Sequence, residues 1–503
     1  MKMMIKEKEE EDDDSENDRV YVWVLHECFL EEETTWEGSK KPMIFLVDKL
    51  PNHIIWDIMS RLEMTNDRNA ASLTCKLLYQ IDKKQRKFLK IGTGLNPANE
   101  ALVLLCNRFK NLQNIEISYD GWSPALGKML DDDGILLLSK HCPNLNELSL
   151  SHCCSLSDYS LMSTVSFSNL SSLKLSFMPG ITATGLMYLF ARNKNLRLLH
   201  IIQCGNVTSL AFLANHQVLE ELWIKNCVGV HEYELFSMGQ IWRNLRLLWF
   251  EAVRNIRDDE SMIGLIEDGY LQQDLICFDS LEQLYLKNCV FNSGREGMAC
   301  LLERSRKLKF VDLDMCFGVS DFNLHQLSLQ SSDLRAFRIK TRSDIIIPYS
   351  SLKDIATNCS KLEWVSLSSD SEMPCFSPYK YDGIMSLIEK CPLSYLSLDL
   401  TYPFNDVGMK ALSSAQFLET LEIMRCQQIT DEGMKVLSGL PNLRYLFIVK
   451  CLGITDNAFK PLFESYKLDE LGVFDCPNIS PQGVCGRGIA SCVRYRQDLT
   501  WML

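Results

Sequence analysis

One register of apolar residues recurs fourteen times along this chain and limits it to a repeating fold. In each copy an anchor leucine is followed by apolar residues three and five positions later, and often by cysteine at eight. The clearest copies read LNELSLSHC from Leu145, LEELWIKNC from Leu219 and LRYLFIVKC from Leu443. The anchors are Leu112, Leu145, Leu170, Leu196, Leu219, Leu245, Leu281, Leu308, Leu334, Leu362, Leu393, Leu418, Leu443 and Leu468. Apolar residues two positions apart indicate a short strand that buries one face.

The segments between the anchors predict a helix in every repeat. The anchors lie about 27 residues apart on average. Stretches such as ITATGLMYL and ITDEGMKVL place Thr or Asp at a turn before an apolar helical face. This pattern resembles the leucine-rich repeat in its cysteine-bearing form. It predicts an α/β solenoid over residues 112–490, with a curved parallel sheet inside and helices outside.

The cysteines are interpreted as structural. The chain has 20 of them, and a small buried thiol at the corner between strand and turn explains why eight share one repeat position. The aligned set is Cys153, Cys204, Cys227, Cys289, Cys316, Cys426, Cys451 and Cys476. No cysteine and histidine spacing typical of zinc occurs, and neither a secretory signal nor a membrane-length apolar run is present. We therefore expect no metal, reduced thiols and an intracellular protein, nuclear or cytoplasmic.

Charge is concentrated at the N-terminal end. The formal net charge is −13, and residues 1–42 contain 14 acidic and 6 basic side chains. Such a segment cannot bury enough apolar surface to order itself, so residues 1–42 are predicted to be disordered. In the remaining chain the acidic and basic residues nearly balance, and no basic face stands out. Nucleic acid is therefore not expected as a partner.

Residues 45–90 predict a compact helical module before the repeats. Pro51 stands where a first helical turn tolerates it. Apolar residues then follow at helical spacing, a polar break is expected at 65–68, and a second apolar face follows it. The first face comprises Ile54, Ile55, Ile58, Met59 and Leu62, and the second comprises Ala70, Ala71, Leu73, Leu77 and Leu78. A unit of this size needs a neighbour to be stable.

At these residues the chain resembles the F-box. Leu50 and Pro51 open the motif, and DRNAASLTCK follows at 67–76. The resemblance implies binding to a Skp-type adaptor and, through it, to a cullin and a RING protein in an SCF ubiquitin ligase. The adaptor-binding residues that it implies are Leu50, Pro51, Ile54, Ile58, Leu62, Leu73 and Cys75.

The whole chain is similar to plant F-box proteins with leucine-rich repeats. The similarity rests on DRNAASLTCK, RKFLKIG at 86–92, LNPANEAL at 95–102 and the closing RQDLTWML. Between module and array, residues 91–111 are predicted as a linker or N-terminal cap. Residues 491–503 are predicted as a C-terminal cap.

A target site is predicted on the concave face, where residues two, four and six positions after each anchor should point. Large aromatic residues fall four positions after consecutive anchors, beside mixed charges. Such a composition is typical of a protein-binding hot spot. The predicted target-binding residues are His200, Trp223, Lys225, Trp249, Tyr285, Lys287, Arg338 and Lys340. Alternatively, a loop packs over the rings as a second core.

Three further segments bear on this site. Residues 254–280 are long for a repeat and could cover or extend it, and residues 369–383 read as another rim loop. Tyr445, Phe447 and Phe474 form a second concave group near the C-terminal end that could instead cap the stack. Basic residues 83–87 could act as a nuclear localisation patch, although a solvated helix end is the favoured interpretation.

The predicted function is a substrate receptor with no catalytic residues and no cofactor. No nucleophile and base pair, metal cluster or phosphate loop stands out. The target would be a protein of unknown identity, and neither nucleic acid nor membrane is expected. A rival hypothesis is an interaction scaffold that does not assemble into a ligase.

Overall fold

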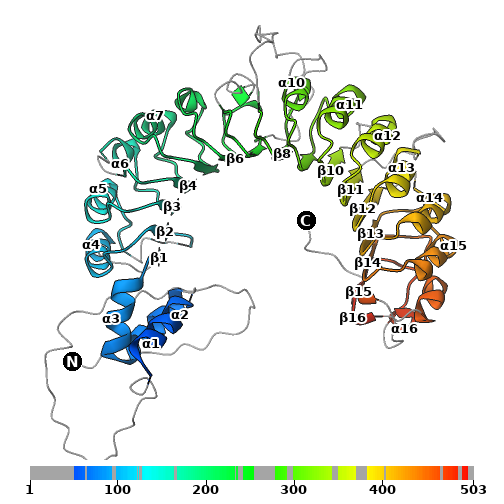
Figure 1. Cartoon of the computed structure of the whole chain (residues 1–503), viewed down its shortest axis with the longest axis horizontal. Coiled ribbons are helices and arrows are strands. Elements are labelled where there is room, and N and C mark those ends of the chain that lie inside the picture. The colour runs from blue at the N-terminus through cyan, green and yellow to red at the C-terminus, as the bar shows by residue number, and fades with distance from the viewer. Residues whose placement is uncertain are drawn as a thin grey trace, which may run out of the picture. The chain divides into compact units, whose positions relative to one another are not determined.

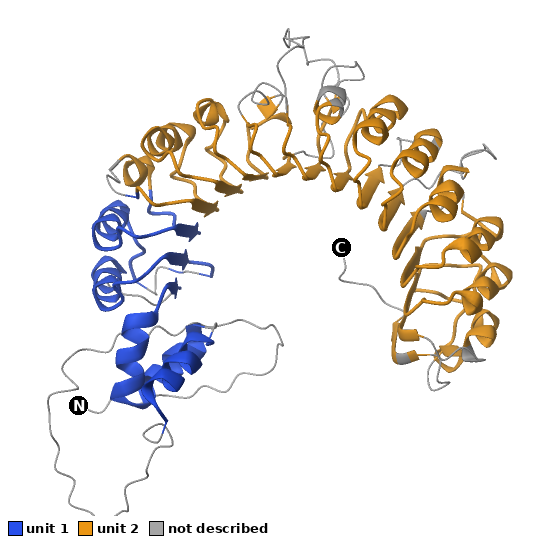
Figure 2. Cartoon of the chain, in the orientation of Figure 1, with its two compact units in different colours: residues 1–156, 164–167 blue, residues 157–163, 168–503 orange. Residues whose placement is uncertain are grey.

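The computed structural model describes residues 50–62, 65–92, 98–121, 123, 127–163, 167–232, 234–235, 242–253, 278–291, 298–341, 349–369, 382–400, 404–464, 468–484 and 490–496. The chain divides into two compact units (Figure 2). Unit 1 comprises residues 1–156 and 164–167, and unit 2 comprises residues 157–163 and 168–503. The predicted acidic segment 1–42 lies outside the described residues.

Unit 1 begins with a three-helix module (Figure 1). Its helices are α1 (Asn52–Ser60), α2 (Thr65–Thr74) and α3 (Lys76–Gln85). The module lies inside the predicted range 45–90, but the break between the first two helices precedes Thr65 instead of spanning 65–68. Successive turns of α1 and α3 supply a small core, made of Ile55, Met59, Leu78 and Ile81.

The rest of unit 1 already has the repeat architecture. It comprises β1 (Phe88–Ile91), α4 (Ala98–Arg108), β2 (Asn114–Ser118), α5 (Asp132–His141) and β3 (Glu147–Ser151). β1 pairs in parallel with β2, and β2 pairs with β3. The sheet therefore starts one strand before the first anchor, Leu112. The segment predicted as a linker or cap at 91–111 contains the helix of this first repeat.

The strands of unit 2 pair in parallel in chain order wherever a register is described. They are β4 (Ser172–Ser176), β5 (Leu198–Ile202), β6 (Glu221–Lys225), β7 (Leu247–Glu251), β8 (Gln283–Lys287), β9 (Phe310–Asp314), β10 (Ala336–Thr341), β11 (Trp364–Ser369), β12 (Tyr395–Leu400), β13 (Thr420–Met424), β14 (Tyr445–Val449), β15 (Leu468–Phe474) and β16 (Ala490–Arg496). The predicted C-terminal cap thus begins within a further paired strand, β16; residues 497–503 lie outside the described part.

Helices cover the outer side of the sheet in unit 2, and the strands line its concave side (Figure 2). The helices are α6 (Asp158–Ser163), α7 (Ala183–Arg192), η4 (Ala211–Leu213), α10 (Met298–Glu303), α11 (Asp321–Gln330), α12 (Tyr349–Asn358), α13 (Asp382–Lys390), α14 (Asp406–Ala411), η5 (Leu412–Ser414), α15 (Asp431–Met434), η6 (Lys435–Gly439), η7 (Asp456–Glu464) and α16 (Pro481–Val484). The predicted α/β solenoid is confirmed.

Strand residues alternate between the core and the concave face. In β6, β7 and β8 the second and fourth residues are buried and the others are partly exposed. The buried pairs are the positions three and five after each anchor, and together with the anchors they stack into an apolar ladder. Leu219, Leu222 and Leu248 are fully buried members of this ladder. The sequence register therefore sets the core.

Eight of the described strands end in a left-handed residue followed by a buried thiol. Nine described non-glycine residues have φ between 52° and 56°: His152, Phe177, Gln203, Asn226, Asn288, Met315, Arg425, Lys450 and Asp475. All but Phe177 directly precede an aligned cysteine. In Cys316 the Sγ atom donates to the Leu286 carbonyl of the preceding repeat at 3.2 Å. All eight aligned cysteines are buried, as predicted.

Carboxylates connect one repeat to the next on the helical side. Asp406 in α14 accepts hydrogen bonds from the backbone N–H and the hydroxyl of Thr430, at 2.8 and 2.6 Å. Thr430 in turn caps α15. Gly433 is needed in that helix because a Cβ there would lie 2.3 Å from Asp406 Oδ1. The same link joins Asp158 to Thr182, Asp431 to Thr455 and Asp456 to Ser480.

Candidate functional site

A row of stacked aromatic rings runs along the concave face of unit 2. The register pairs Trp223, Trp249 and Tyr285 on adjacent strands. Their ring centroids are 5.0 and 4.4 Å apart, and Trp249 and Tyr285 are nearly parallel at 7°. All three side chains are partly exposed. The predicted contiguity of these rings, about one strand spacing apart, is confirmed.

The row extends through three rings that were not predicted. Phe310 stacks on Tyr285 at 4.6 Å, and Trp364 stacks on Tyr395 at 4.7 Å. Phe310 and Trp364 lie two strands apart, yet their centroids approach to 6.2 Å because the intervening residue is Ala336. These three residues occur two positions after their anchors, whereas Trp223, Trp249 and Tyr285 occur four positions after theirs. The row therefore shifts from one set of aligned strand positions to another between β8 and β9. Reading the positions two and four after each anchor together would have revealed the whole row.

A lysine covers the centre of the row. The Lys225 ammonium lies 4.0 Å from the Trp223 ring centroid and 3.4 Å from that of Trp249. Burial lowers the pKa of Lys225, Glu251 opposes that shift, and Lys287 adds to it. Lys287 itself pairs with Glu251 at 3.3 Å. Two of the predicted lysines thus belong to one charge network over the indoles.

A second charge network lies on β9 and β10, next to Tyr285. Arg338 pairs with Asp312 at 3.1 Å. Burial raises the pKa of Asp312, while Arg338 opposes the shift. One oxygen of Asp312 and one of Asp314 are buried without a hydrogen-bond partner among the described residues. Lys340 lies beside them on β10 and is partly exposed. Arg338 on β10 and Lys287 on β8 both stabilise the charged form of Asp312.

His200 is the least accessible of the predicted target-binding residues. Its side chain stacks on Trp223 at 4.1 Å and bonds to Glu221 at 2.8 Å. Only 10% of the side chain is exposed. His200 therefore closes the N-terminal end of the aromatic row and supports Trp223, a role that solvent-facing periodicity did not reveal.

The second aromatic group lies on β14 and β15. Gly472 is buried between Phe447 and Phe474, and a Cβ there would lie 2.5 Å from one ring and 2.7 Å from the other. Tyr445 precedes Phe447 by one concave position and lies 5.7 Å from the Arg444 guanidinium carbon. The glycine thus leaves room for the two phenylalanine rings to fold inward.

The helical module presents apolar side chains outward. Ile54 and Ile58 of α1 are 40% and 48% exposed, and Leu73 of α2 is 52% exposed. Leu50 and Pro51 are also exposed, just before α1. The apolar face predicted for the first helix is therefore divided in two. Ile55 and Met59 belong to the core, whereas Ile54 and Ile58 point outward. Leu62 and Cys75 are partly buried against that core.

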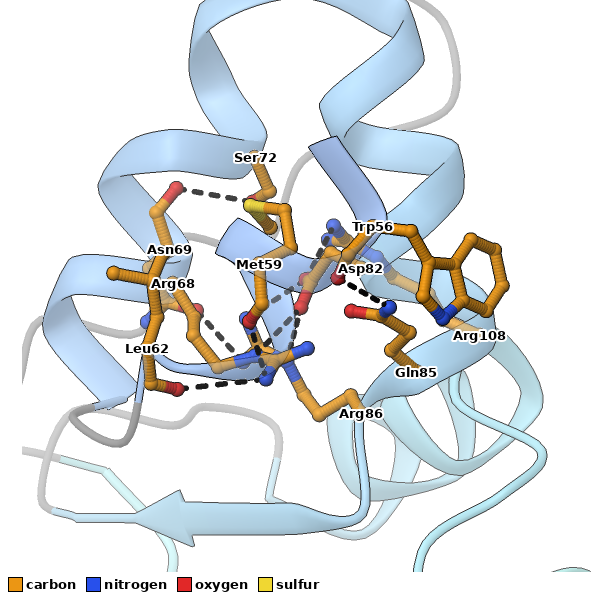
Figure 3. Close-up of polar contacts among 10 residues, drawn as sticks. All are labelled: Trp56, Met59, Leu62, Arg68, Asn69, Ser72, Asp82, Gln85, Arg86 and Arg108. Carbon is orange, nitrogen blue, oxygen red and sulfur yellow. Dashed lines mark hydrogen bonds and ion pairs between the residues drawn. The ribbon is translucent and has the colours of Figure 1, made fainter. Parts of the chain in front are cut away.

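A fully buried carboxylate holds the module together (Figure 3). Asp82 in α3 pairs with Arg68 at 3.1 Å and with Arg86 at 2.8 Å, and the Arg108 guanidinium of α4 lies 3.9 Å away. Burial lowers the pKa of Arg86, and Asp82 opposes the shift. Arg86 is 2% exposed. The expected solvated helix end at 83–87 is therefore wrong for Arg86.

Among the residues that the structure describes, no cluster of three or more histidine, cysteine or acidic side chains is placed to hold a metal ion. Within the same residues, no helix combines the length and apolar character needed to cross a membrane. Residues 254–277 and 370–381, which make up most of the two predicted rim segments, lie outside the described residues.

The family described as Leucine Rich repeat matches residues 141–162 and 414–438. A chain from the crystal structure of the Rad7 and Elc1 complex in yeast is 17% identical, with 90% of this chain and 98% of that chain covered and a TM-score of 0.44. A chain from the TLR13–ssRNA13 complex is 18% identical, with 77% and 50% covered and a TM-score of 0.46. The matched segments contain strands β3 and β13, so this protein contains leucine-rich repeats.

Proposed function

We propose that this protein is the substrate-recognition subunit of an SCF-type ubiquitin ligase. It would itself be non-catalytic. Its helical module would bind a Skp-type adaptor, which bridges to a cullin and a RING protein, and the concave face would hold a protein target. Holding a target raises the local concentration of its lysines near the conjugating enzyme.

The observation that carries the adaptor half is the outward apolar face of the module. Ile54 and Ile58 lie one helical turn apart, and both are exposed although neighbouring Ile55 and Met59 are buried. An exposed apolar stripe of this kind fits a partner that covers it. The F-box resemblance of residues 50–76 supports a Skp-type adaptor as that partner.

The aromatic row supports the target-binding half. Partly exposed Trp and Tyr side chains beside charged residues match the composition of interface hot spots. Because Trp249 and Tyr285 stack face to face, they present their edges together with the charges of Lys225 and Lys287. This arrangement suits a protein surface that carries both apolar and acidic groups.

A double substitution of Ile54 and Ile58 by Ala tests the adaptor half. The variant should lose co-purification with a Skp-type adaptor while its thermal unfolding stays close to that of the unmodified protein, since both side chains are exposed. Replacing Leu329 and Leu452, each 52% exposed on the repeats, is the matched control. Undiminished adaptor binding by the double variant would contradict the proposal and favour the scaffold hypothesis.

The target half is tested by Trp249→Ala. Truncating an aromatic anchor commonly costs about 2 kcal/mol of binding free energy or more, which is roughly thirtyfold in affinity. Phe417→Ala is the control, because Phe417 is 62% exposed and lies outside the row. Unchanged affinity for an identified target would place recognition elsewhere, with Phe447 and Phe474 the next surface to test.

A further inference from the structure

The function proposed above does not use the positive charge of a cleft in unit 1, although one predicted adaptor-binding residue, Leu62, lines that cleft. Its volume is about 780 Å³, and its walls come from all three module helices and from the first repeats. The cationic side chains that line it are Arg68, Lys84, Arg86 and Lys87. No acidic residue is among the described residues of its lining. A cleft of this volume is large enough for an extended stretch of side chains.

The buried charges behind this cleft leave it positive. Asp82 pairs with Arg68, with Arg86 and, at a longer distance, with Arg108. One negative charge therefore faces three guanidinium groups. The Nη2 atom of Arg68 is buried without a hydrogen-bond partner among the described residues. Such unbalanced charges in a low-dielectric wall attract anions to the cleft.

Two lysines at the mouth are free to clamp an anion. Lys84 and Lys87 are exposed, and no described acidic side chain pairs with either. The Lys84 carbonyl accepts from the Asn111 side chain, and the Lys87 carbonyl accepts from the backbone N–H groups of Gln113 and Asn114. Exposed Trp56 and Phe88 also line the cleft and add an aromatic surface.

We propose that the acidic segment 7–18 of the same chain binds in this cleft. The segment contains nine acidic side chains and one lysine, and Tyr21 and Trp23 follow it closely. Its charge complements the four cations of the lining, and the two aromatic residues complement Trp56 and Phe88.

Chain connectivity favours this occupant over a separate molecule. Residues 19–49 join the acidic segment to Leu50, and α1 begins two residues later with Trp56 and Ser60 on the cleft wall. A coil of 31 residues has a root-mean-square span of about 30 Å. A tethered ligand of that reach has an effective concentration on the order of millimolar. Residues 7–18 therefore compete strongly with free anions for the cleft.

Zero-length carbodiimide cross-linking of the full-length protein tests the contact, because it joins a carboxylate to an amine only when the two touch. Peptides from 7–18 should be joined to Lys84 and Lys87 at about 0.05 M salt. The cross-links should largely disappear at about 1 M salt, where the Debye length is about 3 Å. Lys83 is the matched control, because it is exposed in the same helix but does not line the cleft.

Amine acylation of the full-length chain provides the second measurement. Replacing the acidic residues of 9–14 by their amides should increase labelling of Lys84 and Lys87 several-fold and leave Lys83 unchanged. Equal cross-linking to Lys83, or unchanged labelling of the two cleft lysines, would overturn the proposal. Cross-links found chiefly between differently labelled copies would also overturn it, by showing contact between molecules. None of these results depends on adaptor or target binding.

Discussion

The helical module and the repeats hold their interiors together in opposite ways. The module has a core of four well-buried apolar residues, Ile55 among them, and one fully buried carboxylate, Asp82. In the repeats, buried leucines recur at every strand, and each one contacts similar residues in the repeats before and after it. Stability is therefore concentrated at one residue in the module and distributed along the array. A single substitution should expose this difference.

The largest effect is expected for Asp82→Asn. The amide leaves three buried or partly buried guanidinium groups without a counter-charge, and breaking such a cluster costs about 3–5 kcal/mol. Chemical denaturation followed by a probe within residues 50–92 should show the module unfolding before the repeats. Asp57→Asn is the control, because the Asp57–Arg61 pair is 58% and 77% exposed and should contribute under about 1 kcal/mol. A single transition at the original midpoint would show that the stability of the module does not depend on Asp82.

A smaller effect is expected at the link between repeats. Gly433→Ala should destabilise the array by about 1–3 kcal/mol, because the added Cβ meets Asp406 and disturbs the cap on Thr430. Gly439→Ala in the same repeat has no atom within 4 Å of its Cβ and should be nearly neutral. The denaturation midpoints of both variants decide the question. Equal midpoints would mean that the carboxylate moves aside at little cost.

The aligned cysteines should show effects of about 1 kcal/mol. Cys316 Sγ lies 3.2 Å from the Leu286 carbonyl, so a serine hydroxyl there retains an acceptor. Cys153 Sγ lies 3.9 Å from Ile117 O and 3.5 Å from Ser151 O. A serine oxygen lies closer to its own Cβ than sulfur does, so at these distances it would be too far from either carbonyl for a good hydrogen bond. Cys153→Ser should therefore cost more than Cys316→Ser. The reverse order in thermal unfolding would show that acceptor distance does not govern the site.

The smallest perturbation is alkylation of the native protein. Burial raises the pKa of the Cys153 thiol to about 12, whereas its neighbour Cys154 is exposed. Because the thiolate is the nucleophile, Cys154 should react with a bulky reagent at pH 8 while Cys153 stays unmodified. Labelling of Cys153 should increase only as the pH approaches 12. Rapid modification of Cys153 at pH 8 would contradict its structural role.

Much of the repeat architecture followed from the sequence because its period repeats. The anchors, the inward positions and the buried thiols were all set by one register, and each copy reinforced the others. Trp223, Trp249 and Tyr285 were found by the same reasoning, since strand pairing carries a column from one repeat to the next. The continuation of the aromatic row through Phe310 was missed, because consecutive aromatic residues were sought only at the position four after each anchor.

The module shows what periodicity cannot resolve. A helical spacing places Ile54, Ile55, Ile58 and Met59 near one face, but only the packing of α1 on α3 decides which of them are covered. Asp82 carried no motif, and its partners are up to 26 residues away in the sequence. The basic run that contains Arg86 looked like a surface patch for the same reason. Ion pairs between distant residues depend on the fold, and composition alone does not reveal them.

The carboxylate links give the array a direction. Asp406 caps the repeat that contains Thr430, and Asp431 of that repeat caps the next, so each described link runs from the N-terminal neighbour to the C-terminal one. A repeat that loses its C-terminal neighbour keeps its own cap, whereas one that loses its N-terminal neighbour has its Thr hydroxyl and N–H uncapped. Fraying should therefore propagate more readily from a break toward the C-terminal end than away from it.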